Sequence, residues 1–228
     1  MKAFLTPLLY VFLCSVVFAQ LPNENTLSVQ IDGQEYKTAP RRIKVGALWY
    51  ITANALKPDK SLKIWFITFE GKEIPGTGLY KVVDEDFPMK NKKQEEILEN
   101  GKYKGIAFIR YAEETRAPRM EFHVGKSRRE NGGEIEITAS SEKALEGRFN
   151  ATLDGTYWKE KAGATVFGGV GRLINKMEDK AITGATGYDS DLDPERWDYR
   201  KQPKKDELIL KDGKFKLVLN KDGSSADK

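Results

Sequence analysis

The sequence predicts an all-β fold, an antiparallel β-sandwich or barrel of roughly ten strands with a long insertion before a C-terminal hairpin. Apolar and polar residues alternate with period two in many short runs, which is typical of strands with one buried and one wet face. Asp-Gly pairs at 32–33 and 212–213 separate such runs and favour tight turns. The strands are not interleaved with helical patterns, which argues against an α/β fold.

The first predicted strand is "LSVQID", residues 27–32, in which Leu27, Val29 and Ile31 share one face. The pair Asp32-Gly33 then turns the chain toward "QEYKTA". Further strands are expected at 43–55, 61–69, 79–83, 102–112 and 119–125. Two of them, "SLKIWFITF" and "IAFIRY", are apolar on both faces, which predicts central strands. One or two helical turns are expected within 90–100.

The C-terminal half continues the alternation. In "GEIEIT" the isoleucines face one way and the glutamates the other, and "LEGRFNATL" alternates in the same manner, with Gly147 as a candidate bulge. "LILKDGKFKLVL", 208–219, predicts a hairpin with a type I′ turn at Asp212-Gly213. The apolar faces predict a core that contains Leu27, Val29, Ile31, Ile135, Ile137, Phe149, Leu153, Phe215 and Leu217.

The N-terminus predicts a secretory signal peptide at 1–19. Lys2 precedes an apolar run, and Val17 and Ala19 are the small residues of a cleavage site before Gln20. The expected localisation is therefore exported, periplasmic or secreted, without an integral membrane span after cleavage. Lipid attachment at Cys14 is the less favoured alternative, because the large Leu13 precedes the cysteine.

The remaining chain, 20–228, is expected to be a single β-domain. Removal of Lys2 leaves 37 of the 38 basic residues against 34 acidic residues, a net charge of +3. The basic runs are interleaved with acids, so nucleic-acid binding is not expected. The single cysteine and single histidine exclude a zinc site built from several of these residues, and no cofactor is expected.

Four motifs occur along the predicted strands: Asp32-Gly33 with Tyr36, Gly78-Leu79-Tyr80, the pair "GEIEIT" and "LEGRF" at 133–138 and 145–149, and Gly213-Lys214-Phe215. Together they resemble a family of exported Bacteroidota β-domains of unknown function. The resemblance covers most of the chain outside 154–206 and implies a β scaffold, but no activity. Many members of that family look like lipoproteins, and the signal of this chain departs from that pattern.

Residues 154–206 are expected to be an insertion in this scaffold. They contain "YDSDLDPERWDYR", in which Asp189, Asp191 and Asp193 have the spacing of the first calcium ligands of an EF-hand loop. Pro194 replaces the glycine of that loop and Arg200 replaces its last glutamate. The acids are therefore candidate metal ligands, and a solvated acidic loop is the favoured alternative.

Aromatic residues of the insertion are candidate ligand contacts. Trp158, Tyr188, Trp197 and Tyr199, with Tyr157 beside them, provide the rings that stack on sugars. The favoured alternative is that these rings cover a small core of the insertion itself. His123, the only histidine, alternates with Phe122 and Val124 and is expected to face away from them on the sheet surface.

No catalytic residue is predicted. The favoured function is a non-catalytic exported β-domain with a binding or envelope-structural role, whose partner is a glycan or another envelope protein. The alternatives are a carbohydrate-binding module that uses the aromatic residues of the insertion, and a glycoside hydrolase-like enzyme with paired carboxylates.

Overall fold

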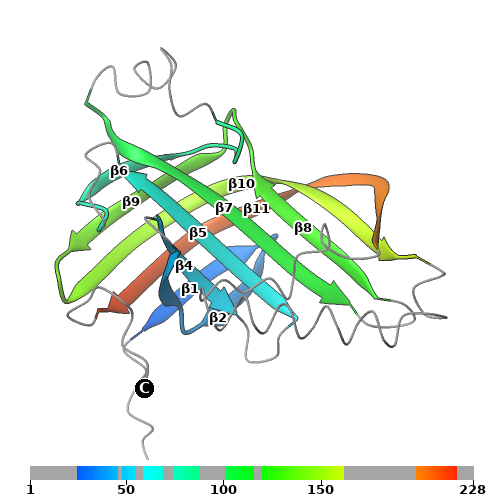
Figure 1. Ribbon diagram of the computed structural model, residues 1–228, viewed down its shortest axis with the longest axis horizontal. Coiled ribbons are helices and arrows are strands. Elements are labelled where there is room, and N and C mark those ends of the chain that lie inside the picture. The colour runs from blue at the N-terminus through cyan, green and yellow to red at the C-terminus, as the bar shows by residue number, and fades with distance from the viewer. Residues whose placement is uncertain are drawn as a thin grey trace, which may run out of the picture.

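The computed structural model describes residues 25–45, 48–54, 59–68, 74–87, 101–115, 120–161 and 199–219. These residues form eleven strands in one mostly antiparallel sheet, which confirms the predicted all-β class (Figure 1). The strands are β1 (Thr26–Ile31), β2 (Gln34–Thr38), β3 (Arg41–Val45), β4 (Leu48–Asn54), β5 (Lys60–Thr68), β6 (Gly78–Val82), β7 (Tyr103–Thr115), β8 (Glu121–Ser127), β9 (Gly133–Ser140), β10 (Ala144–Glu160) and β11 (Tyr199–Val218). No helix within these ranges is long and apolar enough to cross a membrane.

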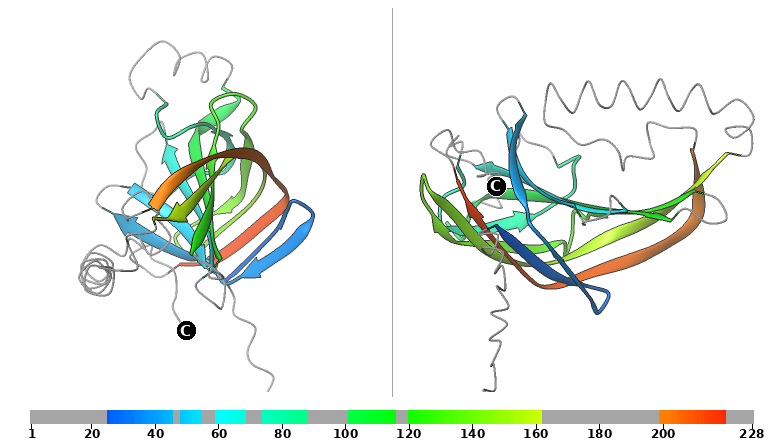
Figure 2. Two further views of the ribbon diagram at one scale, coloured as in Figure 1. Left: turned by 90° about the vertical axis from the view of Figure 1, so that its right-hand side faces the viewer. Right: turned by 90° about the horizontal axis from the view of Figure 1, so that it is seen from below.

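The sheet has the order β2-β1-β11-β10-β9-β6-β7-β5-β4-β3, and β8 pairs with both β10 and β7. The long strands β7 and β10 are therefore bridged in two ways. Near one end two strands, β6 and β9, lie between them, whereas near the other end β8 alone does so. The sheet curls so far that the Tyr36 hydroxyl of β2 donates a 2.9 Å hydrogen bond to the Ala53 carbonyl of β4 (Figure 2).

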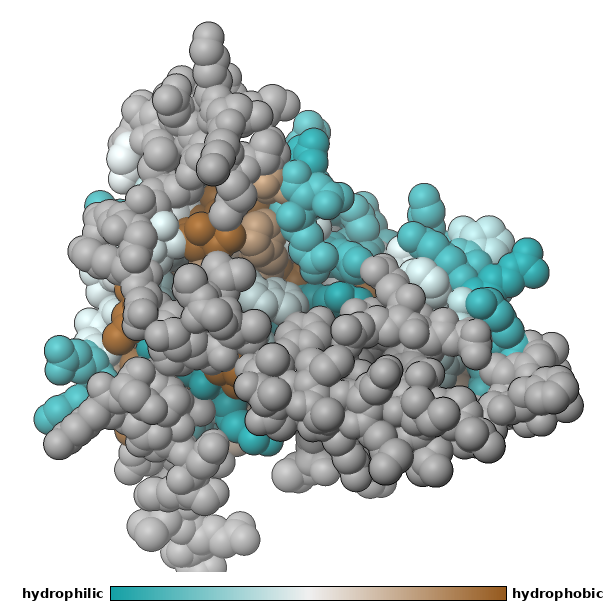
Figure 3. All heavy atoms as spheres, in the orientation of Figure 1, coloured by the Kyte–Doolittle hydropathy of each residue, from teal (hydrophilic) through white to brown (hydrophobic). Residues whose placement is uncertain are grey.

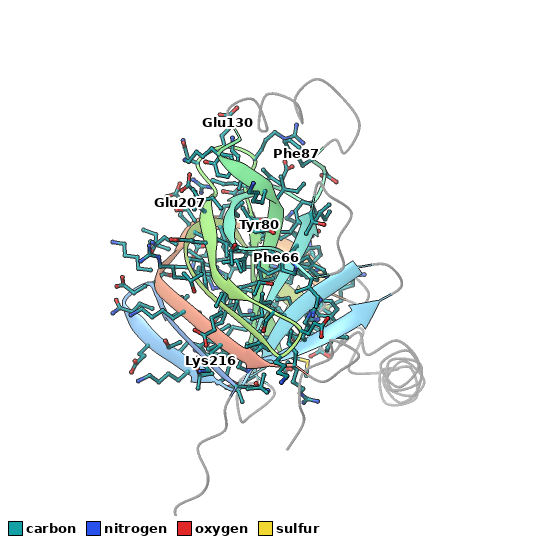
Figure 4. The ribbon with its side chains drawn as sticks, turned by 90° about the vertical axis from the view of Figure 1, so that its left-hand side faces the viewer. Phe66, Tyr80, Phe87, Glu130, Glu207 and Lys216 are labelled. Carbon is teal, nitrogen blue, oxygen red and sulfur yellow. The ribbon has the colours of Figure 1, made fainter. Side chains whose placement is uncertain are left out.

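The core fills the inside of this curl. All nine residues that the alternation places in the core are buried, with at most 8% of any of them exposed. Phe66 and Tyr80 point into the interior, whereas Glu207 and Lys216 lie on the outer surface (Figure 4). Smaller apolar clusters lie outside the main core; one of them contains Ala112, Phe122 and Val124.

The junction between the two bridging arrangements is closed by a side chain. The buried Ser127 hydroxyl, at the end of β8, donates a 2.6 Å hydrogen bond to the Val83 carbonyl. The same oxygen accepts a 3.2 Å hydrogen bond from the Ile109 amide of β7. Ser127 thus satisfies two backbone groups at the point where β6 and β8 meet the same strand, and buried backbone groups need such partners.

The predicted C-terminal hairpin is wrong. Residues 208–218 belong to one continuous strand, β11, which pairs with β10 on one side and with β1 on the other. Asp212 does have a positive φ of 53°, but it forms a bulge, and its amide donates to the Asn150 side chain. A bulge and a tight hairpin both need a residue with positive φ, so the local sequence alone cannot separate them.

The remaining sequence-based strands are mostly confirmed. Asp32-Gly33 forms the tight turn between β1 and β2, with φ of 49° and 79°. The run at 43–55 is a hairpin rather than one strand, because Val45 of β3 pairs directly with Leu48 of β4. That reversal carries no Asn-Gly or Asp-Gly signal. The predicted signal peptide and the predicted helical turns at 90–100 lie outside the described residues.

The expected insertion begins and ends inside long strands. Residues 154–160 extend β10 and residues 199–206 begin β11, and the two segments pair with each other from Gly155–Asp206 to Glu160–Tyr199. Residues 162–198 lie outside the described part of the chain. The ribbon of β10 and β11 therefore continues the scaffold sheet beyond the main core.

Candidate functional site

The inner face of the sheet changes from apolar to polar where β8 alone joins β7 to β10. Side chains alternate along β8, so that Phe122 and Val124 pack in the outer cluster and His123 faces the inside of the curl. His123 is paired with Glu113 of β7 and with Tyr157 of β10. A row of three polar side chains thus crosses three strands. The described residues at this end, on the right of Figure 1, present a hydrophilic surface (Figure 3).

His123, Tyr157 and Asp206 form a hydrogen-bonded network in this region. Asp206, on β11, lies 3.0 Å from His123 Nε2 through Oδ1 and accepts a 2.6 Å hydrogen bond from the Tyr157 hydroxyl through Oδ2. The imidazole and the Tyr157 ring stack, with centroids 4.2 Å apart and planes 5° from parallel. Lys204 Nζ lies 4.0 Å from the centroid of the Tyr157 ring. The network therefore holds both aromatic rings in fixed orientations.

Two paired glycines make room for this network. Gly125 of β8 and Gly155 of β10 are directly opposite each other on the inner face. A Cβ atom at Gly155 would lie 1.8 Å from Asp206 Oδ1 and 3.0 Å from His123 Nε2. A Cβ atom at Gly125 would lie 2.5 Å from a methyl carbon of Leu208. The Asp206 carboxylate can lean across β10 toward His123 only because residue 155 has no side chain.

The network shifts the pKa values of Asp206 and Tyr157. Partial burial acts to raise the pKa of Asp206, but the hydrogen bonds from Tyr157 and His123 outweigh it, so the pKa lies below its ordinary value. Burial first, and the hydrogen bond to Asp206 second, raise the pKa of the Tyr157 phenol to about 12. Asp206 is thus an ionised acceptor, and His123 Nε2 must carry the proton that lies between them.

A second polar group faces the first across β7. Glu113 accepts a 3.0 Å hydrogen bond from the Tyr111 hydroxyl and pairs with Lys60 Nζ at 2.9 Å. Lys60 and Glu113 are each about a third exposed at the side chain, with 30% and 33% of their surface accessible. Burial first, and the charge and hydrogen bond of Glu113 next, raise the pKa of Tyr111 above its ordinary value.

These groups line an open cavity of about 280 Å³ inside the curl. One wall comes from β7, β8, β10 and β11, and the other comes from the β1–β2 hairpin and the start of β5. The lining residues are Ile31, Asp32, Gln34, Glu35, Tyr36, Lys60, Tyr111, Glu113, His123, Tyr157, Asp206 and Leu208. The cavity is smaller than most sites for drug-sized ligands and suits a small polar molecule.

The acidic side chains and the imidazole of the cavity are not arranged as a metal centre among the described residues. No group of three or more His, Cys, Asp or Glu side chains within the described ranges is arranged to hold a metal ion. Asp206 and Glu113, the two carboxylates deepest in the networks, are each already bound to two protein groups. The strongest interactions of both carboxylates are therefore hydrogen bonds and ion pairs within the protein.

Among the aromatic residues named from the sequence, Tyr157 lies in the cavity network, and the others lie elsewhere or outside the described ranges. Trp158 and Tyr199 pack against the outer cluster of Ala112, Phe122 and Val124, on the sheet face opposite His123. The Tyr199 ring meets Phe122 edge to face at 4.9 Å. Tyr188, Trp197 and the candidate metal ligands Asp189, Asp191 and Asp193 are outside the described part of the chain.

The sequence pattern pointed to Tyr157 as a candidate aromatic residue, but it did not predict a site at His123 or Asp206. His123 does face away from Phe122 and Val124 as expected, but only 16% of its side chain is exposed, so it is a cavity residue and not a surface one. The alternation also carries a signal for Asp206, which lies two residues before the buried Leu208. Tyr157 lies four residues after Leu153, on the same face. The local pattern does not give the strand register, which brings these three side chains together.

Comparisons with known proteins do not assign this chain to a family. No protein-family model matches the chain, and neither the curated proteins nor the solved structures searched contain a significant match.

Proposed function

We propose that this chain is an exported, non-catalytic β-domain that binds a small polar ligand in the cavity lined by His123, Tyr157 and Asp206. The observation that carries the proposal is the gap at Gly155, through which Asp206 reaches two aromatic side chains on neighbouring strands. Polar side chains that converge on a cavity at the mouth of a curled sheet are typical of a small-molecule site. The apolar run at 1–19 supports the exported part of the proposal.

The same geometry favours binding over glycoside hydrolysis. A hydrolase with paired carboxylates needs one of them to remain protonated as the general acid, which requires a raised pKa. The pKa of Asp206 is lowered instead, because Tyr157 and His123 both donate to the carboxylate. The second carboxylate, that of Glu113, is already engaged by the Lys60 ammonium and the Tyr111 hydroxyl.

The proposal can be tested with the single histidine of the chain as a reporter. NMR signals of the imidazole ring belong to His123 alone, so a saturable shift on addition of a compound reports binding at the cavity. A panel of small amines, sugars, polyols and carboxylic acids serves as the set of probes. We expect at least one class to shift the His123 signals and to raise the melting temperature.

A pair of glycine variants provides the control. Gly155→Ala places a methyl group against Asp206 and His123 and should abolish the ligand-induced shift. Gly76→Ala introduces a methyl group with no atom within 4 Å and should leave it unchanged. Equal responses of the two variants, or a panel in which no class shifts the signals, would contradict binding at this cavity.

A further inference from the structure

We infer that the ligand of this cavity is a small organic cation, an ammonium or guanidinium compound. The inference rests on the proposed function, because it names the chemical class of the molecule that the same cavity binds. It depends on which hydrogen-bonding groups of the cavity remain unused once the protein's own bonds are counted.

Each of the three tyrosine hydroxyls of the cavity already donates its proton in a hydrogen bond to the protein. Tyr36 donates to the Ala53 carbonyl at 2.9 Å, Tyr111 to Glu113 at 3.0 Å and Tyr157 to Asp206 at 2.6 Å. A phenol has one proton and two acceptor lone pairs. What each hydroxyl can still offer a ligand is therefore an acceptor oxygen, not a donor.

These phenols also keep their protons in neutral solution, so the set of hydrogen-bond donors and acceptors in the cavity does not change there. Burial is the main cause that raises the pKa of Tyr36 and Tyr111, and nearby carboxylates raise it further. The Tyr157 phenol is raised in the same way. Each hydroxyl thus continues to donate to its protein acceptor rather than ionise.

His123 follows the same pattern. The Asp206 carboxylate can only accept, so His123 Nε2 carries the proton between them and Nδ1 is the ring nitrogen left for a ligand. No hydrogen bond to Nδ1 occurs within the described residues. The imidazole therefore leaves one ring nitrogen, Nδ1, for contact with a ligand.

The formal charge of the cavity completes the argument. The cavity lining contains four carboxylates, those of Asp32, Glu35, Glu113 and Asp206, and one ammonium group, that of Lys60. The Lys204 ammonium lies beside them on the Tyr157 ring, so the formal charge of these six groups is −2. Glu35 is paired with Lys37 at 2.7 Å on the exposed side, so the carboxylates that matter most are the other three. Acceptors, negative charge and aromatic rings together favour a ligand that is both a cation and a hydrogen-bond donor.

The structure contains an intramolecular example of such a contact. Lys204 Nζ lies 4.0 Å from the Tyr157 ring centroid, and the imidazole stacks on the same ring at 4.2 Å. Two groups that close to one ring must lie on opposite faces of it. The Tyr157 ring thus already holds an ammonium group on one side, and a ligand cation would use the Tyr111 and Tyr157 oxygens with the carboxylates beside them.

The test compares small molecules of different charge, four of which share a four-carbon chain. The probes are 1,4-diaminobutane and 4-guanidinobutylamine as cations, 1,4-butanediol and D-glucose as neutral molecules, and succinate as an anion, each added to the full chain while the His123 NMR signals are followed. We expect saturable shifts with the two cations, weaker binding at higher ionic strength, and no response to succinate.

Variants assign the effect to the carboxylates. Glu113→Gln keeps the size of the side chain and removes its charge, and should weaken binding of the diamine at least ~10-fold. Glu146→Gln, in an ion pair with Lys216 on the outer surface, should not change it. If Glu113→Gln does not fold, Asp32→Asn decides the question, because asparagine tolerates the positive φ and still accepts from the Ile209 amide.

The outcomes separate the two proposals. If butanediol, glucose or succinate shifts the His123 signals as strongly as the diamine, the cavity binds ligands but the assignment to cations is wrong. If binding of the diamine is unaffected in the carboxylate variants, the assignment is also wrong. If no probe shifts the signals, both the ligand class and the binding function at this cavity are contradicted.

Discussion

The two ends of the inner sheet face use the same device for opposite purposes. At the end bridged by β6 and β9, Gly147 and Gly213 lie opposite Phe215 and Phe149, and an added Cβ would come within 2.5 Å of the facing ring in each pair. At the end bridged by β8, Gly155 lies beneath the Asp206 carboxylate in the same way. Because glycine has no side chain, these positions leave room for aromatic rings at the first end and for the charged network at the second.

The difference between these ends shows what separates core from site in this fold. The strand pairing and the alternation are continuous between them, since β10 and β11 run through both. Only the residues that fill the space above the glycines change, from phenylalanine to aspartate, tyrosine and histidine. We expect the apolar end to determine stability and the polar end to determine binding, and the following substitutions test that division.

The largest effect is expected from Phe149→Ala. The ring is 2% exposed and covers Gly213, so its removal leaves a cavity that the neighbouring strands cannot fill. The free energy of unfolding should fall by about 3–5 kcal/mol, measured by urea denaturation. Ile209→Ala, at a site that is 40% exposed, should cost well under that, about 1 kcal/mol or less. Similar costs for the two variants would contradict the assignment of Phe149 to the core.

Gly155→Ala should have an intermediate effect. The added methyl group must displace the Asp206 carboxylate, because the two cannot lie 1.8 Å apart. Overpacking of this kind costs about 1–3 kcal/mol, and the His123 NMR signals should move because its partner has moved. A variant with unchanged stability and unchanged imidazole signals would show that residue 155 does not position the network.

Asp206→Asn should lower stability less, by about 1–2 kcal/mol at neutral pH, because an amide cannot accept from both His123 and Tyr157 as the carboxylate does. The pH dependence has a defined sign. Since the pKa of Asp206 is lowered in the folded protein, its stabilising contribution is present above the ordinary aspartate pKa of about 3.9 and is lost as the pH falls through the lower folded value. Acid unfolding of the variant should therefore depend less steeply on pH, which circular dichroism can measure.

Tyr157→Phe should have the smallest effect, about 0.5–1.5 kcal/mol, because one hydrogen bond to Asp206 is lost while the ring still stacks on His123. The Tyr157 phenol should ionise at about pH 12 instead of near 10, as a difference in ultraviolet absorbance between the two proteins would report. With its pKa raised on folding, the hydroxyl contributes stability that is complete below about pH 10 and lost as the pH rises through 12. An ordinary phenol titration would contradict the network.

The sequence by itself determined the fold class and the inner face of most strands. Period-two alternation requires that residues two apart share a face, so Leu27, Val29 and Ile31 had to be buried together once one of them was. The same rule placed His123 opposite Phe122 and Val124. Positive φ at Asp32 and Gly33 likewise followed from the residue types, because only a few residues adopt that conformation in a tight turn.

Only the tertiary structure decided which strands pair and which side chains contact one another. Asp212-Gly213 is a bulge instead of a hairpin because strands on both sides pair across it, and no local pattern contains that information. Asp206 meets His123 across 83 residues of sequence, through a register set by strand pairing over the whole length of β10. Alternation assigns each side chain to a face, but long-range pairing assigns its neighbours, so the core was predictable and the cavity network was not.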